Sequence, residues 1–213
     1  MSDNLQSVFD KVALKSSKNR YDGEEQNELL YSELKGLGWK IAGSGDYSDV
    51  YSHARKDFII KINRIKDNGF MYFEKLTKQF PNPHFPKFYE IKKMYGASIY
   101  LYKIEKLEPL HSEDGIRFYY VFSAVKIATD AKTLRTGVRM LENKGKTIEE
   151  LSYGCLTDRD IDDFHEYLDR EPALEKAVDI LLTHKRESLD ISLANIMKRK
   201  DGTIVITDPY SWI

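Results

Sequence analysis

Three polar side chains near the end of the chain have types and spacing suited to phosphoryl transfer. Asp190 and Asn195 are separated by four residues, and Asp208 ends an apolar run further on. In phosphotransferases, such an acid orients the attacking hydroxyl, and an amide and a second acid hold Mg²⁺ against the phosphates. We therefore expect Asp190 to be catalytic and Asn195 and Asp208 to bind the metal. Taken singly, each could instead be a loop residue that makes turn hydrogen bonds.

A glycine-rich turn near the start of the chain could bind phosphate groups. Gly43 and Gly45 lie between two predicted strands, and glycine lets backbone N–H groups approach phosphate oxygens. An ordinary hairpin turn is the alternative. Strands on both sides exclude a Rossmann turn, and no Lys-Ser or Lys-Thr follows as in a Walker loop. The predicted nucleotide-binding residues of this region are Gly43, Ser44, Gly45, Ser48 and Val50.

Lys61 lies inside an apolar run, where an ammonium group is costly unless it is paired. Strand alternation would put Ile60 and Ile62 on one face and Lys61 on the other. A solvent-facing lysine is the alternative, but the upstream glycine turn favours a lysine that contacts phosphate. Glu74 is the only acid in the helix predicted at 70–79. We expect it to orient Lys61, although a solvated helix glutamate would look the same in the sequence.

Short apolar runs between turn residues indicate strands, and longer segments bounded by glycine or proline indicate helices. Gly36 follows the first predicted helix, Pro81 follows the second, and Pro172 suits a first helical turn. Tyr95-Gly96-Ala97 is a predicted hairpin turn. We expect strands at 39–42, 50–53, 58–63, 88–92, 98–104, 195–198 and 203–207, and helices at 24–35, 70–79, 116–128, 131–144, 158–168 and 172–185.

Strands with one helix, followed by a helical stretch, is the element order of a two-lobed α+β protein. We predict an antiparallel sheet in the first lobe and a truncated, mostly helical second lobe. The predicted domains are a helical extension at 1–38, a first lobe at 39–108 and a second lobe at 109–213. The segment 105–109 is the predicted hinge between the lobes.

The composition favours a soluble globular protein of the cytoplasm. Of the 213 residues, 41% are hydrophobic and 31% are charged, enough for a substantial core. The formal net charge of −1 gives no electrostatic reason to bind nucleic acid or anionic lipid. Cys155 is the single cysteine, so no internal disulfide can form. We find no apolar run long enough for a membrane span and no signal sequence, and expect no membrane partner.

Four short sequence segments occur in the order typical of one enzyme family. They are Gly-Ser-Gly-Asp-Tyr-Ser-Asp-Val-Tyr-Ser-His at 43–53, Ile-Lys at 60–61, Asn-Ile-Met at 195–197 and Ile-Thr-Asp-Pro at 206–209. In these segments the chain resembles the eukaryotic-like protein kinases, and among them the early serine/threonine kinases of short-tailed T-odd coliphages. The resemblance implies a two-lobed kinase fold with ATP and Mg²⁺ as cofactors. It also implies host proteins, including the transcription machinery, as substrates in the host cytoplasm.

The chain departs from the kinase pattern beside the predicted catalytic residues. Ser188 stands where these enzymes usually have histidine, and Ser192 stands where serine/threonine kinases usually have lysine. Pro209 and Tyr210 replace the usual Phe-Gly after Asp208. Because Pro209 fixes φ and Tyr210 lacks the freedom of glycine, we expect Asp208 not to flip.

The end of the given chain at Ile213 leads to three further expectations. We expect no activation loop, and hence no regulation by its phosphorylation. We expect substrate recognition to use other surfaces, such as the helices within 116–168. We also expect Trp212 to pack against the second lobe and hold Asp208 in place, since chain ends fray unless they are tied down.

Two other functions compete with that of a protein kinase. The first is a kinase-like module that inhibits a host protein by binding it, which Ser192 favours. The presence of Lys61, Asp190, Asn195 and Asp208 together opposes it, because a pure binding protein has no physical need for all four. The second is a small-molecule phosphotransferase, which would use the same residues. The sequence gives no signal of an oligomeric state.

Overall fold

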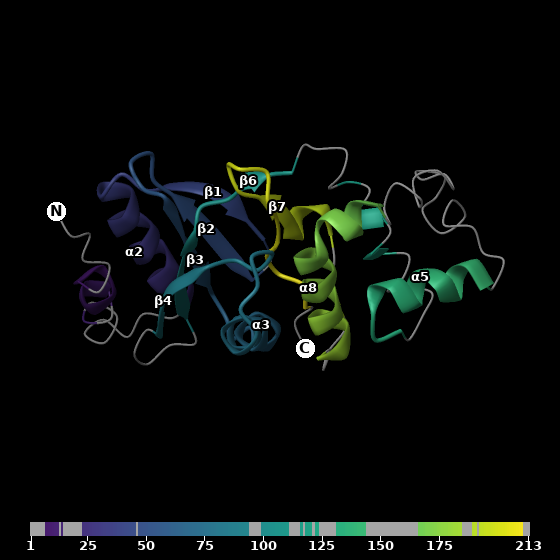
Figure 1. Ribbon diagram of the computed structural model, residues 1–213. Helices are drawn as coiled ribbons and strands as arrows, with labels where there is room; N and C mark the ends of the chain where they lie inside the picture. The colour runs from purple at the N-terminus through teal and green to yellow at the C-terminus, as the bar shows by residue number, and fades with distance from the viewer. Residues whose placement is uncertain are drawn as a thin grey trace. The chain divides into compact units, whose positions relative to one another are not determined.

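The computed structural model shows an α+β protein with an antiparallel sheet and several helices (Figure 1). This confirms the predicted α+β class, and the kinase-like form of the fold stays a prediction. The chain divides into two compact units. Unit 1 comprises Met1–Asp67 and Lys87–Lys106, and unit 2 comprises Asn68–Pro86 and Leu107–Ile213. The structure describes residues 7–12, 14, 23–45, 47–93, 99–110, 116, 118–120, 122–123, 131–143, 166–184, 189–190 and 192–210.

Unit 1 is built on a five-stranded sheet in the order β1-β2-β3-β5-β4, with every neighbouring pair antiparallel. Residues between Ile41 and Gly43 interrupt the regular register of β1 with β2. The two edge strands are therefore β1 and β4. The elements are α2 (Gly23–Gly36), β1 (Lys40–Ser44), β2 (Ser48–Ser52), β3 (Phe58–Asn63), β4 (Phe88–Lys93) and β5 (Tyr100–Glu105).

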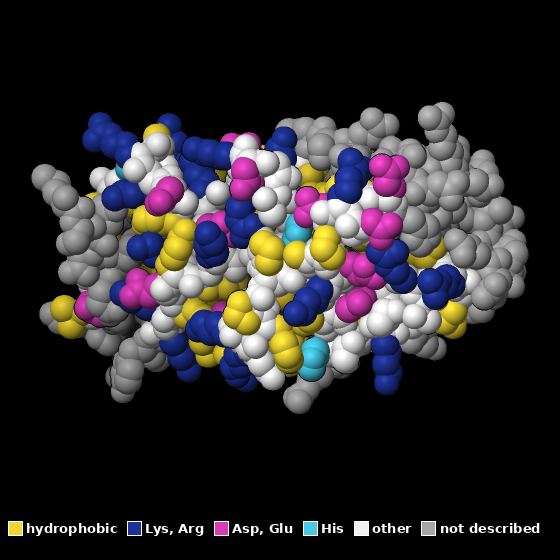
Figure 2. All heavy atoms as spheres, viewed as in Figure 1, with side chains coloured by type: hydrophobic (Ala, Val, Ile, Leu, Met, Phe, Trp, Pro, Cys, Tyr) yellow, Lys and Arg dark blue, Asp and Glu magenta, His cyan; other side chains and the backbone are white. Residues whose placement is uncertain are grey.

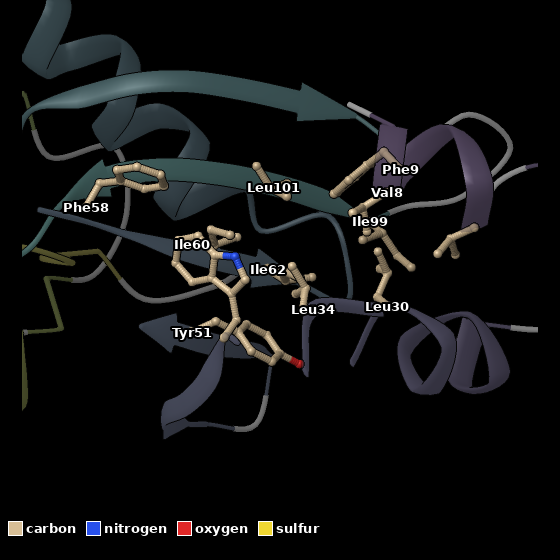
Figure 3. Close-up of a cluster of buried hydrophobic side chains, with 12 residues drawn as sticks. Val8, Phe9, Leu30, Leu34, Tyr51, Phe58, Ile60, Ile62, Ile99 and Leu101 are labelled. Carbon is tan, nitrogen blue, oxygen red and sulfur yellow. The ribbon is translucent and has the colours of Figure 1, made fainter. Parts of the chain in front are cut away.

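Alternation along β3 directs one face of the sheet toward helical residues. Ile60 and Ile62 belong to the same buried cluster as Leu30 and Leu34 of α2 (Figure 3). Burying an aliphatic side chain of this size contributes about 1.5–3 kcal/mol. Residues 7–12, which are helical, add Val8, Phe9 and Val12 to this cluster. The predicted helical extension thus belongs to the same compact unit as the sheet.

Unit 2 combines helices with a small three-stranded antiparallel sheet in the order β6-β7-β8. Gly202, in the turn between β7 and β8, has φ of +90°, a conformation that glycine adopts without strain. The elements are α3 (Asn68–Gln79), β6 (Glu108–Pro109), α5 (Leu134–Asn143), α8 (Pro172–Thr183), the 3₁₀ helix η1 (Leu193–Asn195), β7 (Ile196–Lys198) and β8 (Ile204–Ile206).

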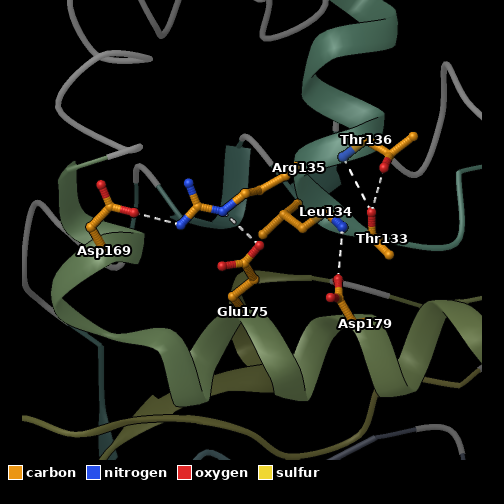
Figure 4. Close-up of polar contacts among 7 residues, drawn as sticks. All are labelled: Thr133, Leu134, Arg135, Thr136, Asp169, Glu175 and Asp179. Atoms are coloured by element: carbon orange, nitrogen blue, oxygen red, sulfur yellow. Dashed lines mark hydrogen bonds and ion pairs between the residues drawn. The ribbon is translucent and has the colours of Figure 1, made fainter.

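Helices α5 and α8 are joined by charged hydrogen bonds (Figure 4). Arg135 donates through Nε to Glu175 Oε1 (2.7 Å) and through Nη2 to Asp169 Oδ1 (2.6 Å). These two bonds raise the pKa of Arg135. Asp179 of α8 accepts from the backbone N–H of Leu134 (2.8 Å) and so satisfies the first free donor of α5. Polar contacts thus fix the start of α5 against α8.

The segment after α3 is attached to both α8 and the β7–β8 hairpin. Asn82 Nδ2 donates to the backbone oxygen of Ala173 (2.9 Å), and His84 Nδ1 lies 2.8 Å from the backbone oxygen of Ile204. His84 is buried, and burial lowers its pKa below the usual 6.5. Arg199 contacts the backbone oxygens of Pro83 and of Phe85, the latter at 3.0 Å. The basic run at 198–200 therefore contains a structural arginine.

Most predicted elements agree with the structure to within a few residues. The strand predicted at 58–63 has the bounds of β3, whereas the strand predicted from 195 begins at Ile196 because η1 includes Asn195. Helix α3 belongs to unit 2, although 39–108 was predicted as one domain. The division at Lys106/Leu107 falls inside the predicted hinge. The 95–97 turn, Cys155, Ser188, Trp212 and most of the helices predicted at 116–128 and 158–168 lie outside the described residues.

Within the described segments, no helix combines the length and the apolar character needed to cross a membrane.

Candidate functional site

Three of the residues predicted to bind nucleotide form a row across unit 1. Gly43 of β1 pairs with Val50 of β2, and Val50 pairs with Lys61 of β3. Because side chains alternate along a strand, this row lies on the sheet face opposite Ile60 and Ile62, and hence opposite α2. The register of the sheet thus brings these three residues together on one face.

Strands β1 and β2 form the glycine hairpin, which carries Gly43 and Gly45. Its backbone conformation does not require glycine at these two positions. Gly38 and Gly202 have positive φ values among the described glycines, whereas Gly43 and Gly45 do not. Among the residues that the structure describes, a Cβ atom at Gly43 would meet no atom within 4 Å, and one at Gly45 would meet only Ser48 O at 3.9 Å. Glycine in a strand costs roughly 0.5–1 kcal/mol relative to alanine. Neither packing nor φ accounts for glycine here, whereas close approach of a ligand would.

The glycine hairpin is held by Arg64, which follows β3. Arg64 donates its backbone N–H to Tyr47 O (2.9 Å), and its guanidinium contacts Gly45 O. The same guanidinium lies 3.6 Å from Asp49, which accepts a hydrogen bond from Ser44 Oγ (2.6 Å). Arg64 was missed by the sequence analysis, because a lone arginine after a strand carries no local signal of a loop contact.

One backbone donor of the hairpin is already used. The N–H of Gly45 donates to Ser48 O at 2.9 Å. A phosphate group at this loop would therefore need other N–H groups, or a change in the hairpin. The side chain of Ser44 is likewise engaged with Asp49.

Lys61 and Glu74 are both buried, at 8% and 6% exposure. The burial of Lys61 excludes the alternative of a solvent-facing strand lysine. Glu74 lies on α3 in unit 2, where its carboxylate forms an ion pair with Lys78 one turn later. The orientation of Lys61 by Glu74 stays a prediction.

In unit 2, backbone hydrogen bonds bring together the segments that carry Asp190, Asn195 and Asp208. The backbone N–H of Asp190 donates to Pro209 O (2.7 Å), and the N–H of Thr207 donates to Asn195 O (2.9 Å). Thr207 Oγ1 also bonds Asn195 O (3.1 Å). Asp208 therefore lies between two residues that are each tied to the loop bearing the other two side chains.

The donor set of these residues suits a hard divalent cation. Asn195 Nδ2 donates to the backbone oxygen of Asp190 (2.9 Å). This bond uses the amide nitrogen and not Oδ1, which is the atom of an amide that binds metal. Asp208 is half-buried and Asp190 is exposed. One amide and one carboxylate oxygen would suit Mg²⁺, which usually takes its remaining ligands from water and phosphate. In the described part of the chain, no group of three or more His, Cys, Asp or Glu residues could hold a metal alone.

Tyr210 is a further residue of this region that the sequence analysis did not place in the site. It is buried, and burial raises the pKa of its hydroxyl. Its backbone forms a bridge with Leu189, beside Asp190. The sequence signal was present, since an aromatic residue replaces glycine after Asp208, but it was used only to exclude a flipping motion.

Charged side chains are numerous on the face shown in Figure 2, with Asp and Glu among the Lys and Arg. Such mixing accords with the net charge of −1. Comparison of the chain with known protein families and with curated proteins finds no match in either.

Proposed function

We propose that this protein is an ATP-dependent kinase that transfers the γ-phosphoryl group to Ser or Thr hydroxyls of host proteins during phage infection. The observation that carries the proposal is the set of hydrogen bonds in unit 2 that ties the loop bearing Asp190 and Asn195 to the two neighbours of Asp208. Catalysis of phosphoryl transfer consists mostly of positioning and charge stabilisation, which fixed acids and amides provide.

Each unit would contribute different groups to the reaction. In unit 1, Gly43, Ser44, Gly45, Ser48 and Val50 would cover the nucleotide. Lys61 would contact the α and β phosphates, and Glu74 of unit 2 would orient it. The order β1-β2-β3-α3-β4-β5 along the chain, with the lysine on the third strand and a glutamate on the following helix, supports a protein-kinase-like fold.

In unit 2, Asp190 would accept a hydrogen bond from the substrate hydroxyl and align it for attack. Asn195 and Asp208 would hold Mg²⁺, which neutralises charge on the phosphate oxygens. Ser192 offers a hydroxyl where a lysine would supply a positive charge, so we expect transfer to be slower than in kinases with that lysine.

The first experiment is incubation with γ-labelled ATP and Mg²⁺, with and without bacterial lysate, followed by a gel. We expect label on lysate proteins, and none with Asp208→Ala. A parallel melting experiment should show a higher Tm with Mg·ATP, because a ligand that binds only the folded state stabilises it. Lys61→Ala should reduce that shift.

The outcomes separate the competing functions. A Tm shift together with transfer of the label to a small molecule of the lysate, but not to protein, would favour a small-molecule phosphotransferase. The absence of both label and Tm shift at millimolar Mg·ATP would favour an inhibitory binding module if the immobilised protein also retains lysate proteins on a column. Label on transcription proteins would identify the transcription machinery as a substrate.

A further inference from the structure

Tyr210 is fixed in unit 2 by contacts on several sides. It is 3% exposed, and its hydroxyl donates to the backbone oxygen of Leu181 on α8 (3.4 Å). Its ring centroid lies 5.5 Å from that of Tyr72 and 6.3 Å from that of Phe73, both on α3. Tyr72 is itself anchored, because its hydroxyl donates to His184 O (2.8 Å). Tyr210 therefore lies among residues from two separate helices.

The backbone around Tyr210 connects this packing to the predicted metal ligands. Tyr210 forms a bridge with Leu189, and Pro209 O accepts from the N–H of Asp190. Asp208 precedes these two residues directly. A displacement of the Tyr210 ring would thus be passed on to Asp208 and to the loop that carries Asp190.

We propose that Tyr210 is a positioning residue that holds Asp208 at a fixed place relative to Asp190 and Asn195. This inference rests on the proposed function, because it concerns the same cation site. Functional groups keep their geometry only when the residues behind them are locked by packing and hydrogen bonds. Tyr210 supplies both, and Pro209 removes one backbone torsion between it and Asp208.

The test measures divalent cation binding without turnover. Mn²⁺ is titrated into the protein in the presence of ADP, and free Mn²⁺ is followed by electron paramagnetic resonance. We expect Tyr210→Ala to weaken Mn²⁺ binding about tenfold or more, as the loss of residues that support metal ligands does. Tyr210→Phe keeps the ring and should bind Mn²⁺ within about threefold of wild type, since it loses only one long neutral hydrogen bond, which goes to α8.

A matched control separates positioning from stability. Phe122 is a fully buried ring of unit 2 whose centroid lies 5.9 Å from that of Phe118. Phe122→Ala should lower the Tm as a cavity mutation does, while Mn²⁺ affinity stays at the wild-type value. If Tyr210→Ala does not fold, Tyr210→Leu and Tyr72→Ala replace it, each with a smaller expected loss of affinity.

The results show separately whether the positioning role of Tyr210 fails and whether the proposed kinase function fails. Wild-type affinity in the Tyr210 and Tyr72 variants would overturn the positioning role while leaving the kinase proposal intact. An equal loss in Phe122→Ala would also overturn it, because the effect would then follow general destabilisation. If the wild-type protein binds no Mn²⁺ with ADP, both proposals fail.

Discussion

The glycine hairpin of unit 1 is exposed along the whole of β1, whereas the segment after β8 that carries Asp208 ends in the buried residues Pro209 and Tyr210. The hairpin is held by polar contacts from Arg64, and the Asp208 segment is held by core packing and backbone bonds. Polar surface contacts are weak, so such elements open at low cost, whereas packed elements open only with the core.

This difference matches what the proposed reaction asks of each region. A loop that covers a nucleotide must open for ATP to enter and ADP to leave. A metal site must instead keep its ligands in place through every turnover. Substitutions in unit 2 should therefore change rate or stability strongly, and substitutions in the hairpin should change ligand binding with little effect on folding.

After the complete loss of transfer expected for Asp208→Ala, the largest expected effect is that of Asp190→Asn. The substituted side chain keeps its shape but loses its charge, so we expect phosphoryl transfer to fall by roughly 10²–10⁴. Because Asp190 is exposed, the Tm of the Asp190→Asn variant should stay close to that of the wild type. The Tm shift with Mg·ATP should also persist, because nucleotide contacts are assigned to other residues. Transfer at the wild-type rate, measured with labelled ATP, would remove Asp190 from the mechanism.

Arg199→Ala should have the next largest effect. Loss of the two guanidinium contacts to Pro83 O and Phe85 O should cost about 1–2 kcal/mol of the free energy of unfolding. Lys200→Ala, at the exposed neighbouring position, is the matched control and should change stability by less than about 0.5 kcal/mol. Urea unfolding of the two variants measures both values. Equal stability of the two variants would show that the basic run at 198–200 is an ordinary solvated turn.

Arg199 also illustrates where prediction from the sequence ends. The strand at 58–63 was predicted because its alternation is a local property, recorded in consecutive residues. The spacing of Asp190, Asn195 and Asp208 was likewise visible. The contacts of Arg199 with Pro83 and Phe85 join distant parts of the chain, and a Lys-Arg-Lys run looks the same whether it is solvated or bonded.

The supports of the candidate site were missed for the same reason. Arg64 reaches back across the hairpin, and Tyr210 packs on two helices that begin far earlier in the chain. Residue types could name the groups that would react. Only the folded arrangement identifies the side chains that hold them, because those partners are set by tertiary packing.

A smaller effect is expected from the pH dependence of His84. Burial lowers its pKa below 6.5, so the unfolded chain binds a proton that the folded chain resists. The free energy of unfolding should therefore fall as the pH drops below about 6.5, and the loss should continue down to the lowered pKa. His84→Asn removes this titration. Its melting curves should show a shallower decline between pH 7 and 5 than wild type, and parallel declines would exclude a contribution from His84.

A small gain in stability, and the sharpest test of the hairpin, is expected from Gly43→Ala. The position has no positive φ, and the described residues leave space for a methyl group, so alanine should raise the free energy of unfolding by about 0.4–1 kcal/mol. If a nucleotide approaches this backbone closely, the same methyl group should obstruct it, and the Tm shift with Mg·ATP should shrink. The variant would then be more stable alone and less stabilised by its ligand. A full ligand shift in Gly43→Ala would show that this glycine does not serve phosphate binding, and the hairpin would then be an ordinary turn.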